Sequence, residues 1–129
     1  MTERYYIENE LNEDMIELIK HHLPNNHLDT IRLYENFNHE TVLYYITDER
    51  GIRRLDAMIS YFFFDFSYDS IVVMQRDNNF NRDMWKILKD TIKTRSKQLR
   101  IMSDPTNQAL RRAVERLKGY WVEDEIIFE

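Results

Sequence analysis

Three histidines and one aspartate near the end of the first predicted helix carry side chains that can bind a metal ion: His21, His22, His27 and Asp29. A helical metal site usually needs two histidines four residues apart on one face. His21 and His22 are adjacent, so their side chains point about 100° apart on a helix. Histidines near a helix C-terminus commonly cap its last carbonyl groups instead. We therefore predict no metal site here.

The candidates for a general base are three aspartates beside predicted strands, Asp56, Asp65 and Asp69. Their spacing does not single out one of them. The sequence contains no Gly-x-Ser-x-Gly elbow and no phosphate-binding loop of the nucleotide-hydrolase type. Because the chain has no cysteine, disulfides, thiol nucleophiles and thiolate metal sites are excluded. We assign no catalytic residue from the sequence.

The elements that would position these side chains follow from hydrophobic periodicity. Aromatic and β-branched stretches predict strands at residues 4–8, 41–47, 53–65, 70–75, 99–102, 120–122 and 125–128. Apolar stripes predict three helices, with N-caps at Asn12, Asn81 and Asp104. The first ends at Pro24, the second near Ser96, and the third at Gly119 as the C′ residue. Residues 28–34 fit either a short helix or an extended segment.

The predicted order of elements indicates an α/β (α+β) fold with a mixed, mainly antiparallel sheet flanked by helices. A strand–helix–strand connection places its two strands in parallel, and that arrangement occurs after residue 70. The length of 129 residues fits a single domain spanning residues 1–129. With 13% aromatic residues the chain can bury a core, so a disordered protein is excluded. We expect neither a membrane-spanning segment nor a signal peptide, and a cytoplasmic location.

The segment from residue 99 to residue 128 resembles the GNAT N-acetyltransferase superfamily. In that family a strand precedes a helix that opens with Asn and a small residue and ends in a Gly-aromatic step, and two strands follow. Here the strand is Leu99–Met102, the helix opening contains Asn107 and Ala109, and the step is Leu117-Lys118-Gly119-Tyr120. The order of elements extends the resemblance over nearly the whole chain, whereas the residue-level resemblance covers about thirty residues.

The resemblance implies an acetyl-CoA site between the strand at 70–75 and the next helix. It assigns cofactor contacts to six residues: Met74, Gln75, Arg76, Asn81, Arg82 and Asn107. The family's loop contains glycine, which lets backbone N–H groups approach the pyrophosphate. Residues 75–83 contain no glycine and two aspartates. The family's proton-donating tyrosine in the last helix corresponds to Ala113 or Val114, neither of which can donate a proton.

The resemblance therefore implies a divergent acetyltransferase-like protein that is non-catalytic, uses no cofactor and acts through protein contacts. The alternative is an active acetyl-CoA-dependent N-acetyltransferase with an unusual cofactor loop. Small divergent proteins of this type occur among tailed-phage virion and morphogenesis proteins, which this chain resembles in size. That likeness implies a virion or assembly role, with the virion as the location.

An aromatic run at residues 61–66 is the main candidate for a partner interface or a homo-oligomer contact, and we assign Tyr61, Phe62 and Phe64 to it. Central burial under helices is the alternative explanation for this run.

Charge is unevenly distributed along the chain: residues 82–118 hold eleven Lys/Arg against four Asp/Glu, although the whole chain has a net charge of −5. This basic segment is a candidate surface for nucleic acid, but its charge also fits two solvated helix faces.

Overall fold

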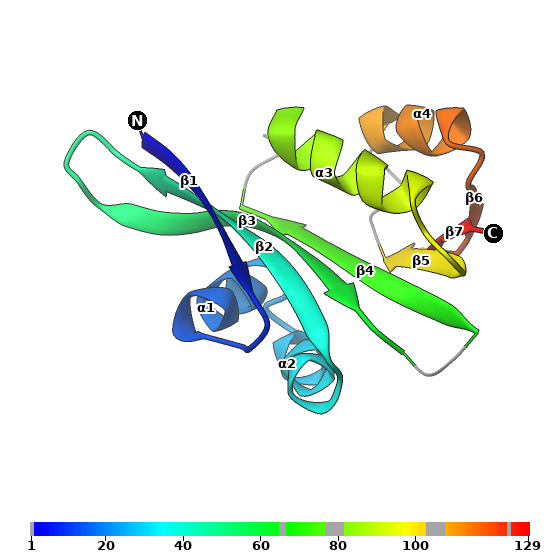
Figure 1. Ribbon diagram of the computed structural model, residues 1–129. Coiled ribbons are helices and arrows are strands. Elements are labelled where there is room, and N and C mark those ends of the chain that lie inside the picture. Colours follow the sequence, from blue (N-terminus) through cyan, green and yellow to red (C-terminus); the bar gives the residue numbers. More distant parts are fainter. Residues whose placement is uncertain (1, 65–66, 77–81, 103–107, 124) are drawn as a thin grey trace.

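The computed structural model describes residues 2–64, 67–76, 82–102, 108–123 and 125–129 (Figure 1). Seven strands and four helices occur in these residues. Their bounds, in chain order, are β1 Thr2–Glu8, α1 Glu13–His22, α2 His27–Asn36, β2 His39–Thr47, β3 Arg53–Phe62, β4 Tyr68–Gln75, α3 Arg82–Lys93, β5 Gln98–Met102, α4 Gln108–Arg116, β6 Tyr120–Val122 and β7 Glu125–Phe128. No helix among these is long and apolar enough to cross a membrane.

The strands form one sheet in the order β1-β2-β3-β4-β5-β7-β6. β4 and β5 pair in parallel and are connected through α3, while every other neighbouring pair is antiparallel. Helices α1 and α2 lie on one face of the sheet, and α3 and α4 lie on the other (Figure 1). The sequence-based prediction of a mixed, mainly antiparallel sheet flanked by helices is confirmed.

Each face of the sheet carries its own apolar core. On the α1/α2 face, Met15, Leu18 and Ile19 of α1 pack against inward side chains of β2, β3 and β4. On the α3/α4 face, Met84, Leu88 and Ile92 of α3 pack against the alternate side chains of the same strands and against β5 and β7. Alternating side chains of the central strands are thus buried on both faces, which explains the nearly continuous apolar runs of β3 and β4.

The two N-terminal helices test the predictions made for Asn12 and for residues 28–34. The predicted N-cap is confirmed, because Asn12 Oδ1 accepts a hydrogen bond of 2.9 Å from the Met15 N–H. The ambiguous stretch at 28–34 is helical and lies within α2. Tyr34, which is buried, and Ile31, which is partly buried, pack into the core from one side of the helix and favour this form. The predicted caps Asn81 and Asp104 lie outside the described residues.

The strand predicted to reach Asp65 is shorter, because β3 ends at Phe62. Beyond this residue the backbone leaves the ladder for other acceptors. The Phe63 N–H donates to the Asn38 carbonyl at 3.0 Å, and the Phe64 N–H donates to Asp69 Oδ1 at 3.2 Å. The alternation of aromatic residues cannot reveal these long-range partners, so the pattern alone overextends the strand.

The end of α4 corrects the prediction for Gly119. The left-handed residue is Lys118, with φ 62°, so Lys118 occupies C′ and Gly119 follows it. The Gly119 N–H donates to the Val114 carbonyl, and the Lys118 N–H donates to that of Glu115, which is the Schellman pattern. Glycine is needed at 119 for space, because a Cβ atom there would lie 2.5 Å from Cε1 of the Phe128 ring.

Neighbouring substitutions at this helix end should therefore have opposite effects on stability. We expect Gly119→Ala to lower the free energy of unfolding by about 1–3 kcal/mol, because the new methyl group overpacks against the buried Phe128 ring. Lys118→Gly should raise it by up to about 1 kcal/mol, because glycine removes the Cβ strain of a left-handed residue. Urea denaturation measures both. A destabilising Lys118→Gly would contradict this assignment of C′.

Candidate functional site

The predicted cofactor site lies where β4 ends and α3 begins. The parallel ladder between β4 and β5 ends at the pair Val72 and Met102, but β4 continues through Val73 and Met74 to Gln75. These last residues of β4 still pair with β3 on the other side. On its β5 side, the described part of the sheet thus leaves the last residues of β4 without a ladder partner, at the carboxyl end of a parallel strand where α/β proteins commonly bind ligands.

Of the two predicted cofactor residues on β4, Met74 faces away from the α3/α4 layer, whereas Gln75 pairs with Ala57 of the α3/α4 core and lies on that side of the sheet. Met74 is 1% exposed and packs in the core beneath α1. The Gln75 carbonyl oxygen lies 3.3 Å from Nδ1 of His22, at the end of α1, and accepts a hydrogen bond when that nitrogen is protonated. The Gln75 side-chain oxygen is buried and has no hydrogen-bond partner among the described residues.

Arg76 connects the end of β4 to two other elements. Its Nε donates to the Leu55 carbonyl at 2.8 Å, and its Nη2 forms an ion pair of 2.7 Å with Glu17 of α1. Its backbone N–H donates to the Asp56 carbonyl at 2.9 Å. With a side chain only 11% exposed, Arg76 is held towards the α1 face and its guanidinium is engaged by protein groups.

The other predicted cofactor residues are less informative. Arg82 is exposed at the first residue of α3. Asn81 and Asn107 lie outside the described residues. The sequence analysis did not find Glu17, because a contact between residues 59 positions apart leaves no local pattern.

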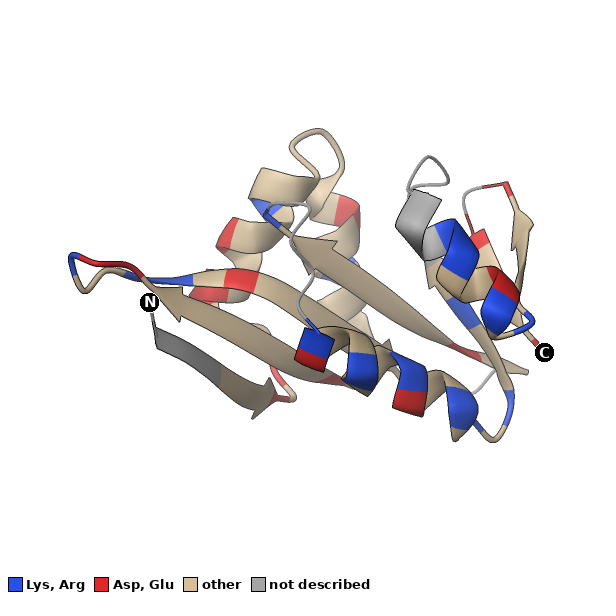
Figure 2. Ribbon diagram, turned by 90° about the horizontal axis from the view of Figure 1, so that it is seen from above, with Lys and Arg blue, Asp and Glu red and all other residues tan. Residues whose placement is uncertain are grey.

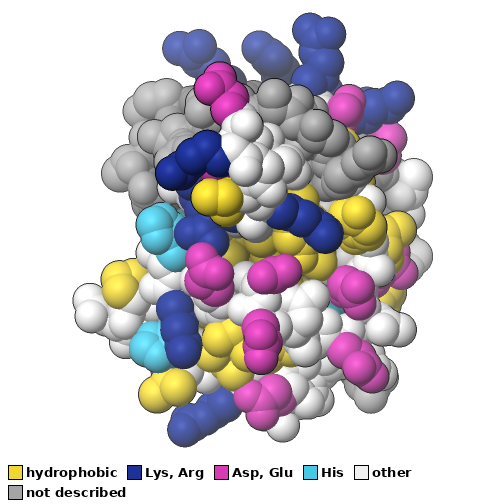
Figure 3. All heavy atoms as spheres, turned by 90° about the vertical axis from the view of Figure 1, so that its left-hand side faces the viewer, with side chains coloured by type: hydrophobic (Ala, Val, Ile, Leu, Met, Phe, Trp, Pro, Cys, Tyr) yellow, Lys and Arg dark blue, Asp and Glu magenta, His cyan; other side chains and the backbone are white. Residues whose placement is uncertain are grey.

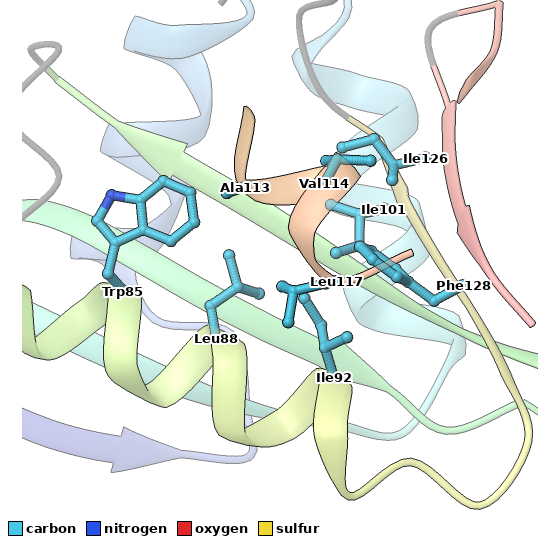
Figure 4. Close-up of a pocket in the computed structure, with 9 residues that line it drawn as sticks. All are labelled: Trp85, Leu88, Ile92, Ile101, Ala113, Val114, Leu117, Ile126 and Phe128. Atoms are coloured by element: carbon cyan, nitrogen blue, oxygen red, sulfur yellow. The ribbon is translucent and has the colours of Figure 1, made fainter. Parts of the chain in front are cut away.

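A small apolar hollow lies between α3, α4 and the strands β5 and β7 (Figure 4). It encloses about 210 Å³, part of which is open solvent. The side chains around it are all apolar: Trp85, Leu88, Ile92, Ile101, Ala113, Val114, Leu117, Ile126 and Phe128. Ala113 and Val114, the positions where the resemblance places a proton donor, both contribute to its wall. None of the side chains in this set can take up or release a proton near neutral pH.

The candidate general bases are engaged elsewhere. Asp56 is 5% exposed and lies 3.2 Å from the Arg54 guanidinium. Asp69 accepts from the Tyr61 hydroxyl at 2.5 Å and pairs with Lys97 at 3.0 Å. Although burial acts to raise the pKa of Asp69, its hydrogen bonds outweigh this effect and hold the pKa below the usual value. A carboxylate of this kind is a weak base. Asp65 lies outside the described residues.

The predicted interface residues divide between core and surface. Phe62 is 0% exposed and packs edge-on against Tyr34 of α2, so its assignment to an interface is wrong. Phe64 is half-buried against Phe37, with ring centroids 4.7 Å apart. Tyr61 is half-buried on the α3/α4 side. For Phe62, the explanation of the run by central burial holds, because its side of β3 faces α2.

A row of buried polar side chains joined by hydrogen bonds lies on the α2 side, and the sequence analysis did not predict it. His39 Nδ1 lies 3.0 Å from Thr41 Oγ1, Thr41 donates to Ser60 Oγ at 2.9 Å, and Ser60 hydrogen-bonds the Tyr34 hydroxyl. All four residues are buried, so this serine–histidine arrangement has no access to a substrate. Because Thr41 donates onward, His39 Nδ1 carries the proton that Thr41 accepts. Its Nε2 has no hydrogen-bond partner among the described residues.

The histidines considered for a metal site lie near backbone carbonyls. His22 Nδ1 is close to the Gln75 oxygen, and His27 Nδ1 lies 3.1 Å from the Pro24 oxygen.

The basic residues of the 82–118 segment extend along α3 and α4, where Figure 2 shows Lys and Arg interspersed with Asp and Glu. Those that are exposed are Arg82, Lys86, Lys89, Lys93, Arg111, Arg112, Arg116 and Lys118. The structure thus gathers positive charge on one side of the sheet.

Comparison with solved structures identifies the architecture. The chain aligns with an N-acetyltransferase, PseH, from Campylobacter jejuni at a TM-score of 0.53 and 16% identity, over 97% of both chains. A Bacillus subtilis acetyltransferase in complex with CoA aligns at a TM-score of 0.56 and 10% identity, over 98% of this chain and 95% of that one. The chain has a GNAT-like acetyltransferase fold. The resemblance stated from the sequence is confirmed for the fold.

A domain from Methanocaldococcus jannaschii aligns at a TM-score of 0.59 and 12% identity, over 98% of this chain and 97% of that one. No protein-family model matches the sequence, and no curated protein sequence matches it. At these identities the likeness concerns the GNAT-like fold and its order of elements.

The engagement of Arg76 predicts a structural role that Arg82 lacks. We expect Arg76→Leu to lower the free energy of unfolding by about 1–3 kcal/mol, because it leaves the Leu55 carbonyl without its donor and Glu17 without its cation. The matched control Arg82→Leu replaces an exposed arginine and should change it by less than about 0.5 kcal/mol. Chemical denaturation measures both. Equal effects would contradict the role of Arg76.

The buried His39 predicts a loss of stability in acid. Burial lowers the pKa of His39 below its ordinary value of 6.5. Below pH 6.5 the unfolded chain therefore binds a proton at this histidine before the folded chain does, and stability falls as pH falls. We expect His39→Gln to reduce the decline in unfolding free energy between pH 7 and pH 5, measured by urea denaturation. An identical decline in the variant and in the wild type would contradict this assignment.

Proposed function

We propose that this protein is a non-catalytic, acetyltransferase-like protein that acts through protein contacts and uses no cofactor. The observation that carries this proposal is the wall of the hollow between α3 and α4. Its apolar lining supplies no acid or base, whereas acyl transfer to an amine benefits from groups that move protons.

The region around the end of β4 supports the same proposal. Segment 75–83 contains no glycine, so close approach of its backbone to a diphosphate meets side chains throughout. The Arg76 guanidinium faces Glu17 on the α1 side, and a phosphate would have to displace that carboxylate. The Arg76 and Glu17 charges at this end of the sheet are thus paired with each other.

Protein contacts are supported by apolar side chains that remain on the surface. The exposed large apolar residues are Tyr5, Tyr6, Ile7, Leu28, Phe37, Ile52, Phe63, Tyr120 and Val122. Tyrosine and phenylalanine are enriched at protein interfaces because they bury a large area with few rotatable bonds. A role in the virion or the assembly of a tailed phage is one form such contacts take, and it rests on the resemblance in size and divergence alone.

The proposal predicts that acetyl-CoA does not bind. In isothermal titration calorimetry we expect no saturable heat from wild-type protein with acetyl-CoA or CoA. The Bacillus subtilis acetyltransferase, whose structure is a complex with CoA, is the positive control. CoA is the appropriate probe because a protein of this fold binds it.

Saturable binding in the micromolar range that is lost in Arg82→Glu would contradict the proposal. That result would favour an active N-acetyltransferase with an unusual cofactor loop, because Arg82 lies at the start of α3, where such a pyrophosphate would bind. Binding that persists unchanged in Arg82→Glu would also contradict the absence of a cofactor and would place CoA elsewhere on the molecule.

A further inference from the structure

The two edges of the sheet differ in length. At one edge β6 has three residues, Tyr120–Val122, and at the other β1 has seven, Thr2–Glu8. A long edge strand presents unpaired backbone donors and acceptors to another chain, and proteins usually protect such edges with a short strand, a proline or a lysine. The β6 edge is protected by its shortness. β1 contains neither proline nor lysine, and its one neighbour in the described sheet is β2.

The side chains of Tyr5 to Glu8 in β1 are exposed, and they lie on both faces of the sheet. Tyr6 is 43% exposed and contacts Tyr45 on the α1 side, and Ile7 is 67% exposed. Tyr5 is 37% exposed and stacks on Tyr44 on the opposite face. Figure 3, seen from the left-hand side of Figure 1, shows hydrophobic side chains on the surface among Asp and Glu side chains. This edge therefore offers both a backbone ladder and apolar contacts.

We propose that β1 pairs antiparallel with β1 of a second copy of this chain, so that the two sheets become continuous across a two-fold axis. Such pairing is the self-association form of strand addition to an exposed sheet edge. Residues directly opposite each other in an antiparallel pair lie on the same face of the sheet. In a two-fold pair, one residue must therefore lie opposite its own copy at the axis. Residues at equal distances on either side of that residue then lie opposite each other.

Charge selects one register. With the axis at Arg4, that residue lies opposite itself, and with the axis at Tyr5 or Ile7 no opposite charges are paired. With the axis at Tyr6, Arg4 of each copy lies opposite Glu8 of the other copy. Tyr5 of each copy likewise lies opposite Ile7 of the other. Opposite charges and aromatic–aliphatic pairs directly across an antiparallel ladder are favourable, and like charges are unfavourable. The register centred on Tyr6 is therefore the self-complementary one.

This inference rests on the proposed function in taking protein contacts as the mode of action, and it names one surface and one partner. The two fail separately. A monomer that does not bind acetyl-CoA would overturn the pairing and leave the proposed function, whereas a dimer that binds acetyl-CoA would do the reverse.

A charge-swap series on the full chain tests the register by sedimentation equilibrium. We expect wild-type protein to form a dimer whose fraction rises with concentration. Arg4→Glu or Glu8→Arg alone should weaken association about tenfold or more, because each places like charges opposite each other. The double variant Arg4→Glu/Glu8→Arg should regain association, because it restores both opposite-charge pairs. A wild-type monomer at the highest soluble concentration, or single variants that associate as the wild type does, would overturn the proposal.

Cysteine cross-linking tests the axis independently, because the natural chain has no cysteine. In the proposed dimer the two Tyr6 positions face each other, so Tyr6→Cys should form a disulfide-linked dimer under mild oxidation. Val122→Cys, which lies at the opposite edge and is also exposed, is the matched control. Faster cross-linking of Tyr6→Cys on a non-reducing gel supports the register, and equal rates in the two variants overturn it.

Discussion

The parallel ladder between β4 and β5 is the constraint on which the rest of the structure depends. Antiparallel neighbours can be joined by tight turns, but this pair requires a crossover, and α3 supplies it. The crossover places α3, and α4 after it, on the face opposite α1 and α2, which divides the core into two layers. The ladder also stops at Val72, so the last residues of β4 depend on contacts with β3 and α1.

Arg76, which follows β4, adds further contacts to this end of the strand. Its hydrogen bond to the Leu55 carbonyl joins the end of β4 to β3, and its ion pair with Glu17 joins it to α1. On the α3/α4 face, apolar side chains of the two helices approach one another across the hollow that Trp85 and Leu117 help to line. In this GNAT-like fold, the space between α3 and α4 is thus bordered by apolar side chains.

Most of the order of elements could be predicted from the sequence because these elements carry local signals, whereas α2 could not, because residues 28–34 fit either a helix or an extended segment. Asn12 caps its helix, and the apolar stripes and alternating strands predict the layers. What could not be predicted depends on distant partners. The Arg76–Glu17 pair, the Phe128 ring that requires glycine at 119, and the burial of Phe62 under Tyr34 each join segments that are far apart in the chain. Periodicity indicates which side of a strand is apolar, but not what covers it.

The central claim is that the end of β4 and the α3/α4 hollow are occupied by the protein's own side chains. An NMR titration of ¹⁵N-labelled protein with CoA tests it residue by residue. The signals to follow are the amides of Val73, Met74 and Arg76 and the indole N–H of Trp85. The account predicts that these resonances stay in place up to millimolar CoA. Saturable shifts confined to these residues would contradict it, because they would show that a cofactor enters between β4 and α3.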